Sequence, residues 1–155
     1  MVDHTFKRGH LGPAEQQEIL TKVGSKILGK APNDWERIIY TRSALIEVAN
    51  SLVEIEFANG EKKRASPPSD IGIPLDELRA GMYIEGKGTW FSLEYVITRP
   101  GKFKVHYNYD DDPGITFGTA KGFTNDLKYF PRDPEHTPDW LNEKLQEEAG
   151  GEGTV

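Results

Sequence analysis

The stretch GTWFSLEYVITRPGKFKVHYNYD, residues 88–110, carries the clearest strand pattern in the chain. Two runs of alternating apolar and polar residues, Trp90 to Thr98 and Lys102 to Tyr109, flank the dipeptide Pro100-Gly101. Alternation with a period of two is typical of a half-buried strand, and a Pro-Gly pair is typical of a tight turn. The stretch therefore predicts a β-hairpin with one face in a hydrophobic core.

Further strands are predicted before this hairpin. Residues 35–57 are rich in β-branched and aromatic side chains and predict two strands joined near Asn50-Ser51, although Arg42 to Val48 could also be helical by propensity. The dipeptide Asn59-Gly60 is a hairpin signal, so Lys62 to Ala65 is expected to form a short return strand.

Helices are predicted before, between and after the strands along the sequence. Residues 13–30 show the helical period after Pro13, residues 74–83 predict a short helix, and residues 123–130 predict a single helical turn. A last helix is expected to bury a stripe made of Trp140, Leu141 and Leu145.

This segregated order of helices and strands predicts a single α+β domain with an antiparallel sheet and helices packed on one face. The expected boundaries are a flexible N-terminus over residues 1–12, the domain over residues 13–148 and a disordered tail over residues 149–155.

The composition excludes several kinds of site and location. The chain has no cysteine, which excludes disulfides, zinc sites with thiolate ligands and thiol nucleophiles, and nothing marks an oxidising compartment. We find neither a signal peptide nor a run of about 18 apolar residues that could span a membrane. We therefore expect a cytoplasmic protein that does not bind membranes.

The net charge of -6 is concentrated in the last third of the chain. Residues 1–107 hold 14 acidic and 15 basic side chains, whereas residues 108–155 hold 11 acidic and 4 basic side chains. This distribution argues against direct binding of nucleic acid and favours a basic protein partner. The simpler alternative is that the acidic excess only keeps the protein in solution.

No pattern of residues indicates catalysis, a metal or a cofactor. Counted from Asp110, a calcium-binding loop would need glycine where Ile115 stands and glutamate where Lys121 stands. The four histidines are far apart in the sequence, and no serine lies in a GxSxG motif. We expect a protein that is not an enzyme; a hydrolase with acids scattered in sequence is a weaker alternative.

The segment YFPRDPEHTPDW, residues 129–140, is dense in aromatic, proline and acidic residues. Asp133 before Pro134 and Thr137 before Pro138 each predict a helix start with a capping side chain. This interpretation leaves Asp133, Glu135 and His136 free to contact a partner.

Two motifs resemble those of a known family. The segments KYFPRDPEHTPDWL, residues 128–141, and HYNYDDDP, residues 106–113, together with the overall layout, resemble the YezG-like immunity proteins of bacterial polymorphic toxin systems. The resemblance extends over roughly Pro13 to Leu145. It implies a small cytoplasmic protein that neutralises a cognate secreted toxin, often a nuclease, and it identifies no set of toxin-contacting residues.

The acidic end of the chain suits such a role, because it could occlude the basic active-site surface of a nuclease. The predicted partner-binding residues are Tyr109, Asp110, Asp111, Asp112, Asp133, Glu135, His136 and Glu143. The alternative is a non-catalytic α+β domain that binds a small molecule in an open cavity lined by Tyr95, Tyr107 and Tyr109.

Overall fold

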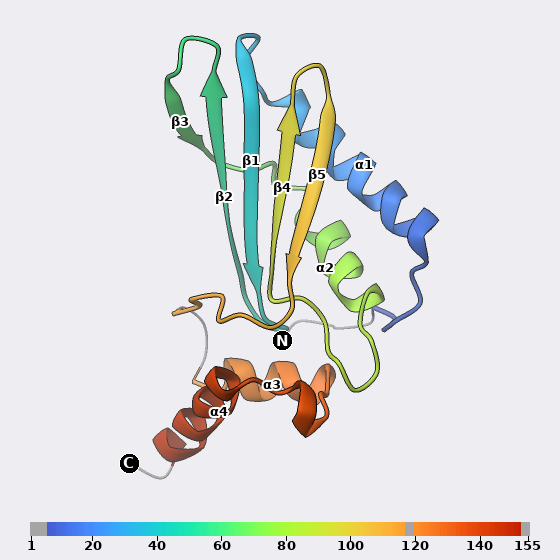
Figure 1. Cartoon of the computed structure of the whole chain (residues 1–155), viewed down its shortest axis with the longest axis vertical. Coiled ribbons are helices and arrows are strands. Elements are labelled where there is room, and N and C mark those ends of the chain that lie inside the picture. The colour runs from blue at the N-terminus through green and yellow to red at the C-terminus, as the bar shows by residue number, and fades with distance from the viewer. Residues whose placement is uncertain (1–5, 117–119, 153–155) are drawn as a thin grey trace.

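The computed structural model describes residues 6–116 and 120–152 of the chain. Five strands form one antiparallel sheet in the order β3-β2-β1-β4-β5, which confirms the predicted α+β class (Figure 1). The strands are β1 Trp35–Ala44, β2 Ala49–Phe57, β3 Lys62–Ala65, β4 Ser92–Thr98 and β5 Lys102–Asn108. The helices are α1 Pro13–Gly29, α2 Gly72–Gly81, α3 Gly122–Tyr129, the 3-10 turn η1 Pro134–His136 and α4 Asp139–Glu152.

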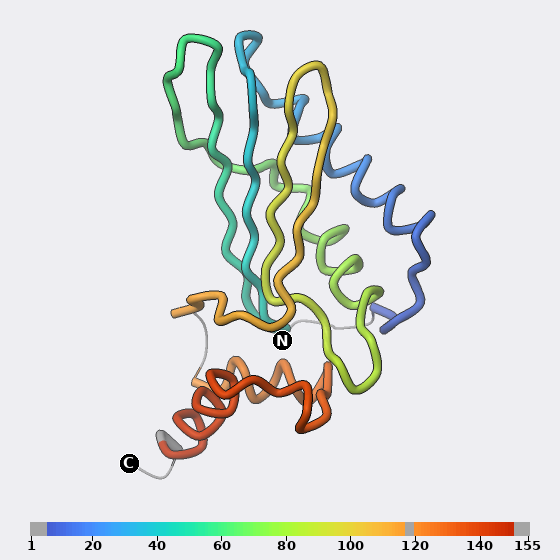
Figure 2. Tube along the Cα trace, in the orientation of Figure 1, coloured from blue at the N-terminus to red at the C-terminus, as the bar shows by residue number. Residues whose placement is uncertain are grey.

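The main core lies between the sheet and two helices. Helices α1 and α2 cover the same face of the sheet, as predicted, while α3 and α4 lie at one end of it (Figures 1 and 2). Alternate strand residues such as Tyr40 and Tyr95 are buried against α1 and α2. The Tyr95 hydroxyl donates a hydrogen bond of 2.6 Å to the Leu20 carbonyl of α1. The strand period seen in the sequence therefore does select the covered face.

A second, smaller core joins α3 and α4 to the end of the sheet. It contains Leu45, Phe91, Ile115, Phe123 and Leu141. The Trp140 ring meets Phe91 edge-on, with centroids 5.3 Å apart. Trp140, Leu141 and Leu145 thus form the predicted apolar stripe of α4.

The turn between β1 and β2 lies earlier than predicted. Asn50 and Ser51 are inside β2, and the chain instead turns over residues 45–48, where the Leu45 N–H donates to the Val48 carbonyl at 2.8 Å. Leu45 is buried in the second core, so the apolar contact decides where the chain turns. The helical alternative for Arg42 to Val48 is wrong as well, because Arg42 belongs to β1.

Both C-terminal helices are longer in the structure than the sequence predicts. Helix α3 has eight residues in place of the expected single turn, because the Glu148 carboxylate of α4 accepts hydrogen bonds from the N–H groups of Phe123 and Thr124 at 3.0 and 2.8 Å. This carboxylate caps α3 from a distant part of the sequence. Helix α4 continues to Glu152, beyond the expected boundary at residue 148, and residues 153–155 of the predicted tail lie outside the described residues.

The N-terminal segment contacts α2. The N–H groups of Gly9 and Leu11 donate to the carbonyls of Ala80 and Gly81 at 2.9 and 3.1 Å. The predicted flexibility of residues 1–12 stays a prediction, and residues 1–5 lie outside the described residues. Within the part of the chain that the structure describes, no helix combines the length and apolar character needed to cross a membrane.

A buried ion pair fixes α3 to α2. Arg79 donates from Nη1 and Nη2 to the two carboxylate oxygens of Asp126 at 2.7 and 2.9 Å, and its Nε donates to the Trp90 carbonyl at 2.7 Å. Both side chains of the pair are almost fully buried. Since planar guanidinium and carboxylate groups match each other, the pair fixes both the distance and the orientation between the helices.

We expect Asp126→Ala to lower the free energy of unfolding by about 3–5 kcal/mol, because it leaves a buried guanidinium without its counter-charge. Urea unfolding of the whole chain measures this. Asp70→Ala is the control, since it removes the exposed partner of Lys26 and should leave the unfolding midpoint almost unchanged. Equal losses in the two variants would contradict the structural role given to the buried pair.

Candidate partner-binding surface

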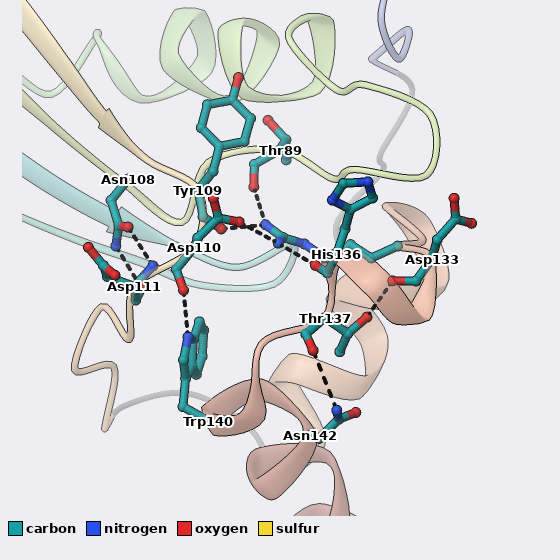
Figure 3. Close-up of polar contacts among 11 residues, drawn as sticks. Thr89, Asn108, Tyr109, Asp110, Asp111, Asp133, His136, Thr137, Trp140 and Asn142 are labelled. Atoms are coloured by element: carbon teal, nitrogen blue, oxygen red, sulfur yellow. Dashed lines mark hydrogen bonds and ion pairs between the residues drawn. The ribbon is translucent and has the colours of Figure 1, made fainter.

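The Arg132 guanidinium joins three segments that are far apart in the sequence. Its Nη2 donates to the carbonyls of Tyr109 at 2.6 Å and Thr89 at 3.1 Å, and its Nη1 donates to the His136 carbonyl at 3.0 Å. The side chain is only 1% exposed. Figure 3 shows Thr89, Tyr109 and His136 gathered at this point. The guanidinium thereby fixes the main chain at the end of β5 against the η1 turn.

Asp110 is held through its main chain and exposes its carboxylate. Its carbonyl accepts a hydrogen bond of 2.7 Å from the Trp140 Nε1 at the start of α4 (Figure 3). Its carboxylate is 76% exposed and lies 3.4 Å from Arg132 Nη1. The Asp110 side chain can therefore reach a partner while its position stays defined.

The next two aspartates lie in the predicted turn. Asp111 exchanges two hydrogen bonds with the Asn108 side chain, with lengths of 2.8 and 2.9 Å (Figure 3). The Asp112 carboxylate accepts a bond of 2.9 Å from the Gly114 N–H. Both aspartates are exposed. These bonds are typical of Asx turns, so part of the aspartate run is explained by local structure.

The second acidic segment follows Arg132 directly. The Asp133 N–H donates to the Gly86 carbonyl at 2.7 Å, and the exposed Asp133 and Glu135 lie on either side of Pro134. The prediction that Asp133 and Thr137 cap helices with their side chains is wrong. The Thr137 hydroxyl instead donates to the Asp133 carbonyl at 2.9 Å, and the Asp133 side chain makes no capping bond. The Asp133 carboxylate therefore remains available.

We call the exposed acids of these two segments the acidic surface: Asp110, Asp111, Asp112, Asp133 and Glu135. The Arg132 guanidinium joins the two segments by donating hydrogen bonds to the carbonyls of the half-buried Tyr109 and His136. Glu143 is exposed on α4 and makes none of these contacts. The structure thus assembles seven of the eight predicted residues and leaves Glu143 apart.

Electrostatic effects at this surface follow from burial. Burial lowers the pKa of Arg132, and the nearby carboxylates of Asp110 and Asp126 oppose that shift. A guanidinium keeps its proton even so. Burial also raises the pKa of Tyr109, against the effect of Arg132, so that Tyr109 is a neutral phenol at physiological pH. The buried Arg132 cation therefore lies 3.4 Å from the exposed Asp110 carboxylate, at the base of the acidic surface.

Sequence reasoning missed the two residues that make this arrangement possible. Arg132 stands directly before Asp133 in a segment of aromatic, proline and acidic residues, and no pattern in the sequence indicates that its side chain is buried. Gly88 has a φ of +91°, and a Cβ there would collide with the Arg132 side chain. Its role follows only from the folded structure.

The cavities do not support the small-molecule alternative in its predicted form. The Tyr95 ring lies in the core and stacks on Phe103 with centroids 5.1 Å apart, and the partly buried Tyr107 packs against the core with its ring 5.8 Å from Trp90. An open groove of about 900 Å³ lies elsewhere, between the N-terminal segment and the residues around Tyr83 and Pro131. Among the residues that the structure describes, no group of three or more His, Asp or Glu side chains could hold a metal ion.

Comparison with known proteins finds a similarity to a family of immunity proteins. Residues 69–135 match the family model described as YezG-like, immunity protein YezG-like. This match confirms the resemblance over a shorter range than the expected residues 13–145, and it includes the whole acidic surface but not Glu143. No curated protein matches the chain. The family match suggests an immunity function and implies binding to a cognate toxin.

We expect Gly88→Ala to destabilise the protein by about 3 kcal/mol or more, because it adds a collision with Arg132 to the strain of a positive φ. Gly60→Ala is the matched control, since Gly60 has a φ of +89° with open space around it, and it should cost only about 1–2 kcal/mol. Thermal or urea unfolding compares the two. If Gly88→Ala cost no more than the control, the close packing of Arg132 would be refuted.

Proposed function

We propose that the chain is a non-catalytic immunity protein that binds a cognate bacterial toxin and blocks the toxin's active surface. The match of residues 69–135 to the YezG-like immunity family supports an immunity role. In this proposal the protein acts in the cytoplasm, where it protects the cell that produces the toxin, and it needs neither a metal nor a cofactor.

The observation that carries the choice of target is the acidic surface held on Arg132. Five exposed carboxylates come from two segments whose backbones one fixed guanidinium joins through the carbonyls of Tyr109 and His136, and the Asp110 carboxylate lies 3.4 Å from it. A surface of this kind is complementary to a basic one, and a groove that binds nucleic acid is basic because it must neutralise phosphates. We therefore propose a nuclease as the class of toxin.

Two physical effects favour binding at this surface. The carboxylates repel one another in the free protein, so a basic partner removes an unfavourable interaction and also speeds association by electrostatic steering. The backbone is already fixed by Arg132 and Trp140, so binding costs little ordering entropy. Tyr109, half-buried beside the acids, can add amphipathic contact area.

We expect a triple Asp→Asn change at Asp110, Asp111 and Asp112 to weaken binding of the toxin by about tenfold or more and to flatten its dependence on salt. The partner to use is the product of a toxin-like gene directly upstream, captured first by co-purification with this chain. Surface plasmon resonance at several salt concentrations then gives the association rate and the affinity.

The control is a triple change of three exposed acids elsewhere, Glu18→Gln, Asp34→Asn and Glu61→Gln, which removes the same charge. It should leave the affinity nearly unchanged. If the triple aspartate variant kept both its affinity and its salt dependence, the acidic surface would be the wrong contact site. Failure of every upstream product to bind would reject the immunity role itself.

A further inference from the structure

The last strand of the sheet has an unpaired edge. Strand β5 pairs with β4 alone among the described strands. The Gly101 N–H closes the hairpin by donating to the Thr98 carbonyl at 2.9 Å, and Thr98 pairs with Lys102. In an antiparallel pair the hydrogen-bonded residues alternate along each strand. The backbone N–H and C=O groups of Phe103, Val105 and Tyr107 therefore point away from β4.

These outward backbone groups are available. Within residues 6–116 and 120–152, no backbone hydrogen bond joins another element to Phe103, Val105 or Tyr107. Strand β5 has seven residues, whereas β3 at the opposite edge has four. An unpaired edge of this length can accept an added strand.

The side chains along β5 define which residues an added strand would need. Lys102, Lys104 and His106 are exposed on the face of the sheet that no described helix covers. Glu94 opposes His106 on β4, but Lys102 and Lys104 lie opposite Thr98 and Val96 and so face no acid across the strand pair. An adjacent strand with acidic residues at alternate positions would complement these cations.

On the other face of β5, an added strand would need apolar residues. Phe103, Val105 and Tyr107 pack against the main core and remain partly exposed. Alternate apolar side chains on an added strand would cover them. A second copy of this chain fits poorly, because antiparallel pairing of two β5 strands would place lysine or histidine next to lysine or histidine.

We propose that β5 binds an extended segment of a partner protein, with alternating acidic and apolar residues, as a sixth strand of the sheet. The backbone groups of Phe103, Val105 and Tyr107 form the new hydrogen bonds, and Lys102, Lys104 and His106 select the acidic sequence. This surface differs in position and in sign of charge from the acidic surface, so the proposal goes beyond the toxin contact.

The test uses a synthetic seven-residue peptide of alternating Glu and Val, added to the isotope-labelled full chain. Amide hydrogen exchange followed by NMR should slow by about tenfold or more at Phe103, Val105 and Tyr107. The Lys104 and His106 amides already bond to β4 and should change little. A peptide with Lys in place of Glu should protect none of these amides.

Matched variants test the role of charge. Lys102→Glu combined with Lys104→Glu should weaken binding of the acidic peptide by about tenfold or more, whereas Lys22→Glu on α1 combined with Lys30→Glu directly after it should leave binding unchanged. The proposal is overturned if the Glu peptide protects no outward amide or if the Lys peptide protects them equally. Protection that rises with protein concentration without peptide would indicate self-pairing and would also overturn it. None of these variants alters the acidic surface, so the outcome is independent of toxin binding.

Discussion

The buried Arg132 guanidinium is the interaction on which the C-terminal half of the structure depends. It donates to carbonyls from the loop before β4, from the end of β5 and from the η1 turn, and it lies 4.9 Å from the centroid of the Phe91 ring in the second core. Charged donors make stronger hydrogen bonds than neutral ones, and an arginine that donates to several fixed carbonyls constrains all of them together. Gly88 supplies the space for this side chain, and the Arg79 and Asp126 pair fixes the helices beside it.

In this arrangement the backbone groups position the acidic segments, and the side chains are left for binding. Carbonyls and N–H groups hold the two acidic segments in place, and the carboxylates remain exposed for a partner. Because the cation lies below the surface and the Asp110 carboxylate is exposed 3.4 Å from it, the exterior stays acidic. At the free edge of the sheet, β5 presents the opposite combination of unpaired backbone groups and exposed cations. The two surfaces therefore suit partners of opposite charge.

The features that could be predicted from the sequence depend on local periodicity. The β4–β5 hairpin and α1 follow from alternation and from the helical period, and the family resemblance follows from two short motifs. The features that could not be predicted depend on contacts between distant residues. Burial of Leu45 moves the β1–β2 turn, Glu148 caps α3, and Arg132 is buried by segments on both sides of it in the sequence. The acids of the site could be named in advance, but the cation that gathers them could not.

The affinity of an Arg132→Met variant for the upstream gene product shows whether this guanidinium builds the binding surface. The substitution keeps every acidic side chain and much of the side-chain volume but removes the donors to Tyr109, Thr89 and His136. We expect a stability loss of about 3 kcal/mol and, under conditions where circular dichroism shows a folded protein, a binding loss of about tenfold or more. Arg64→Met, at an exposed position on β3, should change neither quantity. A folded Arg132→Met protein with unchanged affinity would contradict the claim that this guanidinium builds the binding surface.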